Sequence, residues 1–236
     1  MITEATVLDA LSGVRDPELD EPITDLKFIS HLRVGDDAVE VTLRLPTPFC
    51  APNFAYLMAH DAREALLSVP GVQEARVTLD DHHTADEINA GMAGGLGFDT
   101  TFHSFEETEG ESLDELRDIF RRKAFVGRQE RLCRTLLADG YSSAQLANMM
   151  LGEVPDSEAK EKYLSRREEL GLDTSAEAPF VVDPDGRQIP EEAVVQHLRF
   201  ARVTRLSIEA NAGFCRGVLA ARSGDTPVLS EKEASA

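Results

Sequence analysis

The sequence predicts an α+β protein in which a small α-β-β-α-β domain precedes a mainly α-helical domain. Residues 1–84 mix helical apolar stripes with alternating, strand-like runs, whereas residues 111–224 keep helical spacing almost throughout. Between them, residues 85–110 are first glycine-rich, in "AGMAGGLGF", and then acidic, so a linker or mobile loop is expected there. The last residues, 225–236, are expected to form a disordered tail.

The elements of the N-terminal domain follow from local patterns. A helix is expected after Thr3 as its N-cap, because Val7 and Leu11 recur at helical spacing. The alternating runs "KFISHLRV" and "AVEVTLRL" flank "GDD" and predict a β-hairpin. The stretch "NFAYLMAHDAREALLSV" predicts a second helix, "PGVQ" ends it, and "EARVTL" predicts a third strand.

Four helices are predicted in the second domain. The first has Ser112 and Glu115 as a capping box and ends at Gly140. The second begins at a serine in "SSAQLANMML", and the third runs from Asp156, its expected cap, to Gly171. The segment "FVVDPDGRQIP" predicts a tight turn between two short extended pieces, and a long helix follows it.

Composition narrows the class of protein. The net charge is −19, from 24 basic and 43 acidic residues, which argues against a nucleic-acid partner. No apolar run approaches the roughly 20 residues that cross a membrane, and "MITEATVLDALSG" lacks the basic flank of a secretion signal. Three widely separated cysteines suit a reducing compartment. A cytoplasmic protein that binds neither nucleic acid nor membrane is therefore expected.

Cys50 lies in "LPTPFCAPNF", where the second predicted strand gives way to a helix. Backbone N–H groups at a helix start favour an anion, so they are expected to lower the pKa of this thiol. A thiolate binds iron, zinc or copper, or attacks an electrophile. The alternative is a cysteine that packs as a small hydrophobe.

Carboxylates and imidazoles flank this junction in the sequence. Asp16 and Glu18 precede the first strand, with Asp25 close behind, and such side chains can assist a metal ion or serve only as turn formers. His82 and His83 follow the last strand. They are candidate zinc or iron ligands if that strand ends near the cysteine, and otherwise a solvated loop cap.

Two further thiols are secondary candidates. Cys133 and Cys215 each lie in a predicted amphipathic helix, and antiparallel packing of those helices would bring them together. The neighbours Arg131, Arg134 and Arg216 would then favour thiolate. The alternative for both cysteines is an ordinary place in a hydrophobic core.

The order of these features resembles the MIP18-like domain family (DUF59), which is found in iron–sulfur cluster assembly factors and in a phenylacetate-degradation accessory protein. The resemblance covers about residues 4–80 and rests on Asp16, Pro17, Glu18, Asp25, Leu26, Thr47, Cys50, Pro52, Gly71 and Val72. Many members have cysteine directly before proline, whereas Ala51 intervenes here, and "DDHHTADEIN" stands in place of the family's strand-end tryptophan segment.

The resemblance implies a factor that installs iron–sulfur clusters or matures metalloproteins and is not an enzyme. Cys50 would hold iron or a cluster transiently, supported by Asp16, Glu18, Asp25 and Thr47. The partner would be an acceptor metalloprotein, and a homodimer is an arrangement that the family allows. The helical part resembles extensions of accessory proteins of bacterial diiron monooxygenases, which would make the acceptor a monooxygenase component.

Two other functions stay open at this point. One is a metal-free adaptor or assembly chaperone in which Cys50 is structural. The other is a thiol enzyme that uses Cys50 as nucleophile, with His82 or His83 as base.

Overall fold

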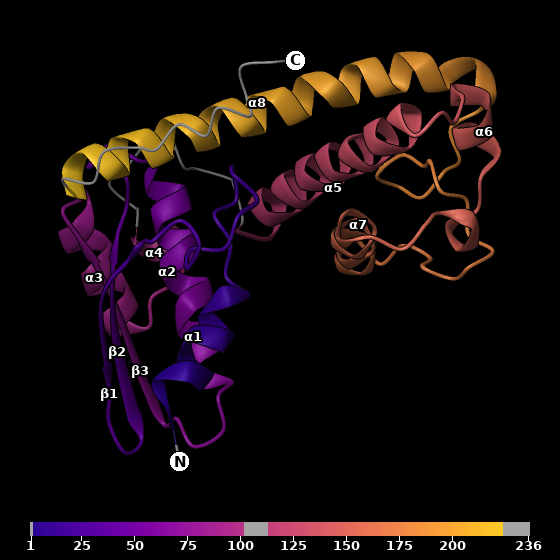
Figure 1. The fold of residues 1–236 in the computed structure, drawn as a ribbon. Helices are drawn as coiled ribbons and strands as arrows, with labels where there is room; N and C mark the ends of the chain where they lie inside the picture. The colour runs from indigo at the N-terminus through magenta and orange to yellow at the C-terminus, as the bar shows by residue number, and fades with distance from the viewer. Residues whose placement is uncertain (1, 102–112, 224–236) are drawn as a thin grey trace. The chain divides into compact units, whose positions relative to one another are not determined.

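The computed structural model describes residues 2–101 and 113–223, and it confirms the α+β class (Figure 1). The contacts divide the chain into two compact units. Met1–Leu113 and Asn211–Ala236 form the first unit, and Asp114–Ala210 form the second. The second domain predicted over residues 111–224 therefore differs at its C-terminal end, because residues 211–223 pack with the first unit.

The first unit is built around a three-stranded sheet in the order β1-β2-β3. Strands β1 (Ile29–Val34) and β2 (Ala38–Arg44) form the expected antiparallel hairpin. Strand β3 (Glu74–Asp80) pairs parallel to β2 after the crossover helix α2 (Pro52–Leu67). A parallel pair needs such a crossover, since its strands must start at the same edge.

Helix α1 (Glu4–Ser12) begins as predicted, with Thr3 accepting the N–H of Thr6 in a capping box. Figure 1 shows α1 and α2 on the same side of the sheet. Every second side chain of β2 and of β3 is buried in the core of this unit. This period-two burial is the one that the alternating runs predict.

Helices α3 (Ala85–Gly94) and α4 (Phe98–Thr101) replace part of the predicted linker. Ile88 is buried, and the Asn89 side chain accepts the N–H of Leu79 at 2.7 Å and donates to its carbonyl oxygen at 3.0 Å. The amide of Asn89 thus satisfies backbone groups of β3 and fixes α3 against it. The small residues of "AGMAGG" therefore permit close helix packing here.

The second unit consists of helices joined by short turns, as the sequence predicts. Ser142 caps its second helix as predicted, whereas Ser157, and not Asp156, caps the third by accepting the N–H of Lys160. The Ser112 cap and the tail over 225–236 lie outside the described residues. The elements are α5 (Leu113–Ala138), α6 (Ser143–Asn148), η2 (Leu151–Glu153), α7 (Glu158–Glu169) and the part of α8 (Glu191–Ser223) that ends at Ala210.

Gln129 of α5 organises the core of this unit. Its buried amide donates to the Tyr163 hydroxyl and to the Val182 carbonyl oxygen, both at 2.9 Å. The ring of His197 donates from Nε2 to the Gln129 Oε1 at 2.7 Å. One side chain therefore joins α5, α7, the turn at residue 182 and α8, and its polar groups are satisfied.

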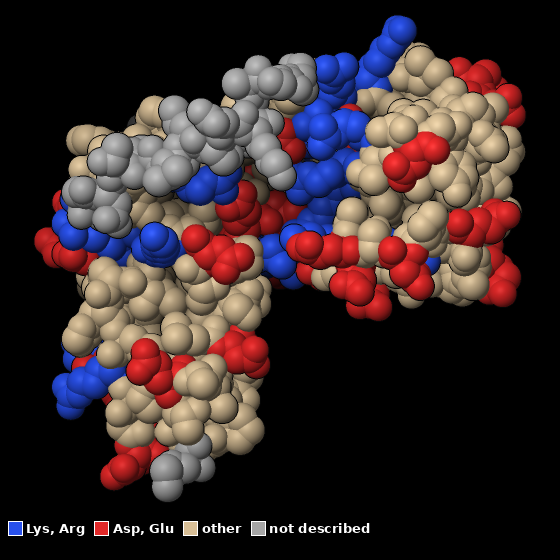
Figure 2. All heavy atoms as spheres, viewed as in Figure 1, with Lys and Arg blue, Asp and Glu red and all other residues tan. Residues whose placement is uncertain are grey.

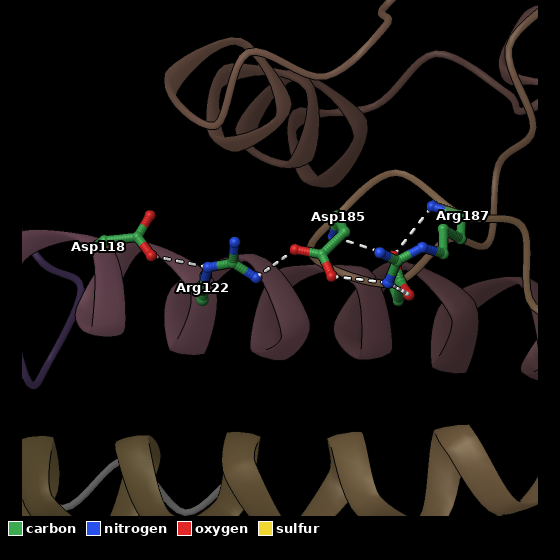
Figure 3. A network of polar contacts seen from close by, with 5 residues as sticks. Asp118, Arg122, Asp185 and Arg187 are labelled. Atoms are coloured by element: carbon green, nitrogen blue, oxygen red, sulfur yellow. Dashed lines mark hydrogen bonds and ion pairs between the residues drawn. The ribbon is translucent and has the colours of Figure 1, made fainter. Parts of the chain in front are cut away.

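Charged side chains form ion pairs on the surface of the second unit. Asp118, Arg122, Asp185 and Arg187 form a chain of ion pairs that links α5 to the turn before α8 (Figure 3). Figure 2 shows Lys and Arg side chains gathered in a stripe over α5 and α8, bordered by acidic ones. Such exposed pairs contribute little to stability, because water and salt screen their charges. No helix within the described ranges is long and apolar enough to span a membrane.

Candidate functional site

The ends of β2 and β3 lie side by side, because the two strands are parallel and Arg44 stands opposite Asp80. The loop 45–51 leaves the end of β2, and His82 and His83 follow the end of β3. The structure thus confirms that the last strand ends beside the cysteine junction.

Cys50 is presented by a short turned loop. Thr47 Oγ1 accepts the N–H of Phe49 at 2.8 Å, and the Thr47 carbonyl oxygen accepts the N–H of Cys50 at 3.4 Å. Pro52 opens α2 at a position where its missing N–H costs nothing. The Cys50 side chain is half-buried in this position, and Phe49 beside it is 80% exposed.

His82 holds this loop through its backbone. Its Nδ1 accepts the N–H of Thr84 at 3.2 Å, so Nδ1 carries no proton and the proton of the neutral ring is on Nε2. Nε2 then donates to the carbonyl oxygen of Cys50 at 2.8 Å. Burial lowers the pKa of His82 and favours this neutral form.

His83 also binds the loop. Its backbone N–H at 3.0 Å and its ring Nδ1 at 2.8 Å both donate to the carbonyl oxygen of Pro48. The exposed ring lies 5.9 Å from that of Phe49, measured between centroids. Nδ1 carries the proton here, so Nε2 is the acceptor nitrogen of the neutral ring.

The two histidines were predicted as metal ligands together with Cys50. In the described part of the chain, no group of three or more His, Cys, Asp or Glu side chains is placed to hold a metal ion. Both nitrogens of His82 are bonded inside the protein, so metal binding by His82 would require one of these bonds to break. Of the two rings, only that of His83 keeps an acceptor nitrogen on its exposed side.

The carboxylate of Asp16 is buried, with 6% of the residue exposed. Its Oδ1 accepts the N–H groups of Glu18 and Leu19, both at 2.9 Å. Burial nevertheless outweighs these bonds and raises the pKa of Asp16 to about 6. Asp25, by contrast, is exposed and accepts a bond of 3.4 Å from the Thr24 hydroxyl.

The expectation that a helix start lowers the pKa of Cys50 is wrong for this conformation. Burial, and then the negative charge of Asp16, raise the pKa of Cys50 to about 12. The N–H of Ala51 does lower this pKa, as an amide near a sulfur should, but the effect is smaller. The thiol is therefore protonated at neutral pH.

The last turns of α8 pack against this site and lie across the end of the sheet (Figure 1). Asn211 Nδ2 donates to Glu18 Oε1 at 2.9 Å. Three turns later, Arg222 Nη1 donates to the carbonyl oxygens of Leu45 at 2.8 Å and Pro46 at 2.9 Å. These two carbonyls directly precede the Thr47–Cys50 turn, so the helix end holds the thiol loop.

An acidic residue completes this anchor. Asp81 has a positive φ of 52° and pairs with Arg222 of α8 and with Arg44 of β2, the latter at 3.3 Å. Arg216 pairs with Glu21 in the loop that follows α1. Ion pairs therefore reinforce the hydrogen bonds that hold the helix end to the first unit.

Cys133 and Cys215 do not share a core. Cys133 is buried in the core of the second unit, where burial raises its pKa. Cys215 belongs to the first unit and is half-buried against the core that Cys50 also contacts. The sequence left open whether Cys133 and Cys215 meet or pack in a hydrophobic core, and the structure places each against a core. That Cys215 packs against the same core as Cys50 was not predicted. The signal was the helical spacing of Asn211, Cys215 and Arg222, which places these polar residues on one side of α8.

Comparison with known proteins supports the assignment of the N-terminal domain. Residues 4–79 match the family described as iron–sulfur cluster assembly protein. An uncharacterized protein from Methanocaldococcus jannaschii is 36% identical over 90 residues, which are 38% of this chain and 93% of that protein. The chain belongs to the iron–sulfur cluster assembly protein family.

Two relatives that match the N-terminal domain are iron–sulfur cluster carrier proteins. The carrier from Deinococcus radiodurans is 37% identical over 71 residues, 30% of this chain and 20% of the carrier. The carrier from a Synechocystis species is 32% identical over 79 residues, 34% of this chain and 22% of the carrier. The chain thus spans about a fifth of the length of these carriers. The family segment contains Asp16 and Cys50 and ends before His82, so the end of α8 is an addition that packs on it.

Proposed function

We propose that this chain is a maturation factor that binds iron or an iron–sulfur cluster transiently through Cys50 and passes it to an acceptor protein in the cytoplasm. The observation that carries the proposal is the position of Cys50. It is the cysteine of the family segment, and it is half-buried in a turn beside the carboxylates of Asp16 and Glu18. It makes no disulfide.

A high thiol pKa suits a transient carrier. The empty site keeps its proton, because burial and the charge of Asp16 disfavour a free thiolate. A cation or cluster supplies the positive charge that makes thiolate favourable, so binding and loss of the proton are coupled. Removal of the cargo restores the neutral thiol. In this proposal the other cargo ligands come partly from the acceptor or from a second copy of the chain, which keeps the site open to exchange.

The chain acts as a carrier and not as an enzyme in this proposal. A thiol enzyme would need a base at the sulfur of Cys50. His82 instead donates to the Cys50 carbonyl oxygen and uses its other nitrogen on Thr84. The arrangement positions the backbone and leaves His82 with no nitrogen for proton abstraction.

The narrower proposal for the acceptor is a component of a diiron monooxygenase, with the second unit as the part that recognises it.

A metal-free adaptor is the second candidate function. The observation that favours it is the packing of Cys50 against the core of the first unit, which is the environment of a structural thiol.

Cluster transfer tests the proposal. The protein is loaded anaerobically with ferrous iron and sulfide, separated from free iron, and mixed with an apo-ferredoxin whose visible absorption reports cluster arrival. We expect transfer by the wild type and by Cys133→Ala, and loss of transfer by Cys50→Ala. The adaptor is supported, and the carrier contradicted, if Cys50→Ala transfers as well as the wild type. Replacing the ferredoxin with an apo-diiron hydroxylase and measuring its recovered activity tests the narrower acceptor.

A further inference from the structure

The last turns of α8 carry a second thiol, Cys215, into the unit that contains Cys50. These turns are anchored at Asn211, which binds Glu18, and at Arg222, which binds the Leu45 and Pro46 carbonyl oxygens. The first anchor is on the loop that carries Asp16, and the second is at the start of the Cys50 loop. The helix segment between the anchors therefore lies over the region where these two loops meet.

Cys215 lies between the anchors, one turn after Asn211. Positions i and i+4 of a helix share a face, so Cys215 points to the same side as Asn211. The two thiols contact the same hydrophobic core, and both feel the negative charges of Asp16 and Glu18. The face of α8 that carries Cys215 is therefore directed toward the loops that carry Asp16 and Cys50.

We infer that Cys50 and Cys215 form a two-thiol site for a thiophilic divalent cation, in which α8 supplies a ligand that the family segment lacks. This inference rests on the proposed function and deepens it, because it adds a ligand to the same site. On binding, each thiol releases one proton to solvent and each sulfur forms one bond to the metal, with no change in oxidation state. The remaining coordination positions stay open to other ligands.

The surrounding charges favour a cation at this point. Two thiolates on loops that also carry the carboxylates of Asp16 and Glu18 would repel one another. A divalent cation removes that repulsion, and soft sulfur ligands select thiophilic metals over Mg²⁺ or Ca²⁺.

Cadmium titration of the full chain tests the site, because each Cd²⁺–thiolate bond adds ultraviolet charge-transfer absorption. Cys50→Ser, Cys215→Ser and the control Cys133→Ser are compared with the wild type. We expect the wild type and Cys133→Ser to bind one Cd²⁺ with the absorption of two thiolates. Cys50→Ser and Cys215→Ser should show about half that absorption and roughly tenfold or greater loss of affinity. Unchanged absorption and affinity in a folded Cys215→Ser protein would overturn the inference.

A second measurement needs no variant and no metal. Dibromobimane becomes fluorescent when it alkylates two neighbouring thiols, and it is applied to the wild-type chain before digestion and mass spectrometry. A fluorescent cross-link between the Cys50 and Cys215 peptides supports the site, and its absence with singly alkylated peptides contradicts it. Neither readout involves a cluster. Failed cluster transfer with intact cadmium binding would therefore reject the proposed function alone, and the reverse result would reject the two-thiol site alone.

Discussion

The ring of His82 donates to the carbonyl oxygen of Cys50 across 2.8 Å, and this bond ties the thiol loop to the end of β3. The bond exists because β2 and β3 are parallel and end at the same edge of the sheet. His82 therefore positions the thiol by way of the backbone.

Replacing His82 with alanine is expected to destabilise the first unit by about 2 kcal/mol, because it leaves the Cys50 carbonyl oxygen and the Thr84 N–H without a partner. Denaturant unfolding measures the loss. His83→Ala is the matched control, and its exposed ring should cost under about 1 kcal/mol. If the two variants lose the same unfolding free energy, the bond from His82 to the Cys50 carbonyl oxygen does not stabilise the first unit as proposed.

Asp16→Asn is expected to stabilise the protein above pH 6. A carboxyl whose pKa is raised on folding contributes stability below its unfolded value of 3.8 and loses it as pH rises through about 6. The difference in unfolding free energy between variant and wild type should therefore grow between pH 4 and 7, toward roughly 3 kcal/mol.

The lowered pKa of His82 changes the unfolding free energy in the opposite direction. The stability that His82 contributes in its neutral form is lost as pH falls. Taking the difference between variant and wild type removes this background, because His82 is present in both. Asp25→Asn, at an exposed carboxylate, is the control variant. A flat difference for Asp16→Asn would mean that Asp16 titrates normally.

The same Asp16→Asn substitution should make Cys50 more reactive. Asp16 is the second largest cause of the raised pKa of Cys50, after burial, so its removal lowers that pKa and increases the thiolate fraction. The rate of alkylation by iodoacetamide at pH 8, read at the Cys50 peptide, should rise by up to about tenfold for each pKa unit gained. Cys133, in the core of the second unit, serves as the internal control.

Arg222→Ala is expected to expose the thiol loop. It removes two hydrogen bonds to the carbonyl oxygens of Leu45 and Pro46 and an ion pair with Asp81. A loss of 1–2 kcal/mol in local stability corresponds to roughly five- to thirtyfold faster alkylation of Cys50. Arg187→Ala, at a surface pair of the second unit, should leave that rate unchanged. No change in Arg222→Ala would show that the helix end does not restrict access to Cys50.

Gln129→Leu is expected to loosen the second unit alone. It leaves the Val182 carbonyl oxygen and the His197 ring N–H without their partner, at a cost of about 2–3 kcal/mol. Hydrogen exchange followed by mass spectrometry should show faster exchange in α5 and α7 and little change in β2 and β3. Asn148→Ala, which removes an exposed amide, is the control.

Local patterns were enough to predict most elements of the fold, but not α3 and α4. Thr3 caps α1, the runs around "GDD" form the hairpin, and Ser142 caps α6, because each signal acts within a few residues. The glycine-rich stretch was read as a linker because its composition suits flexibility. Its helix depends on the bonds of Asn89 to Leu79, which are distant in sequence.

The site could be predicted only in part. The position of Cys50 at a strand end, and of the histidines near it, follows from the order of strands. The roles of these residues do not follow from the order of strands. The pKa of Cys50 depends on burial and on Asp16, and the role of His82 depends on its bond with Thr84. The contact of α8 with the site joins residues almost 200 positions apart, such as Glu18 and Asn211.

Iron and acid-labile sulfide, counted per chain after anaerobic reconstitution, test the cargo-binding role of Cys50 most directly. The account predicts that the wild type and Cys133→Ser retain iron and sulfide through gel filtration, and that Cys50→Ser retains neither. Equal iron and sulfide in Cys50→Ser and the wild type would contradict it.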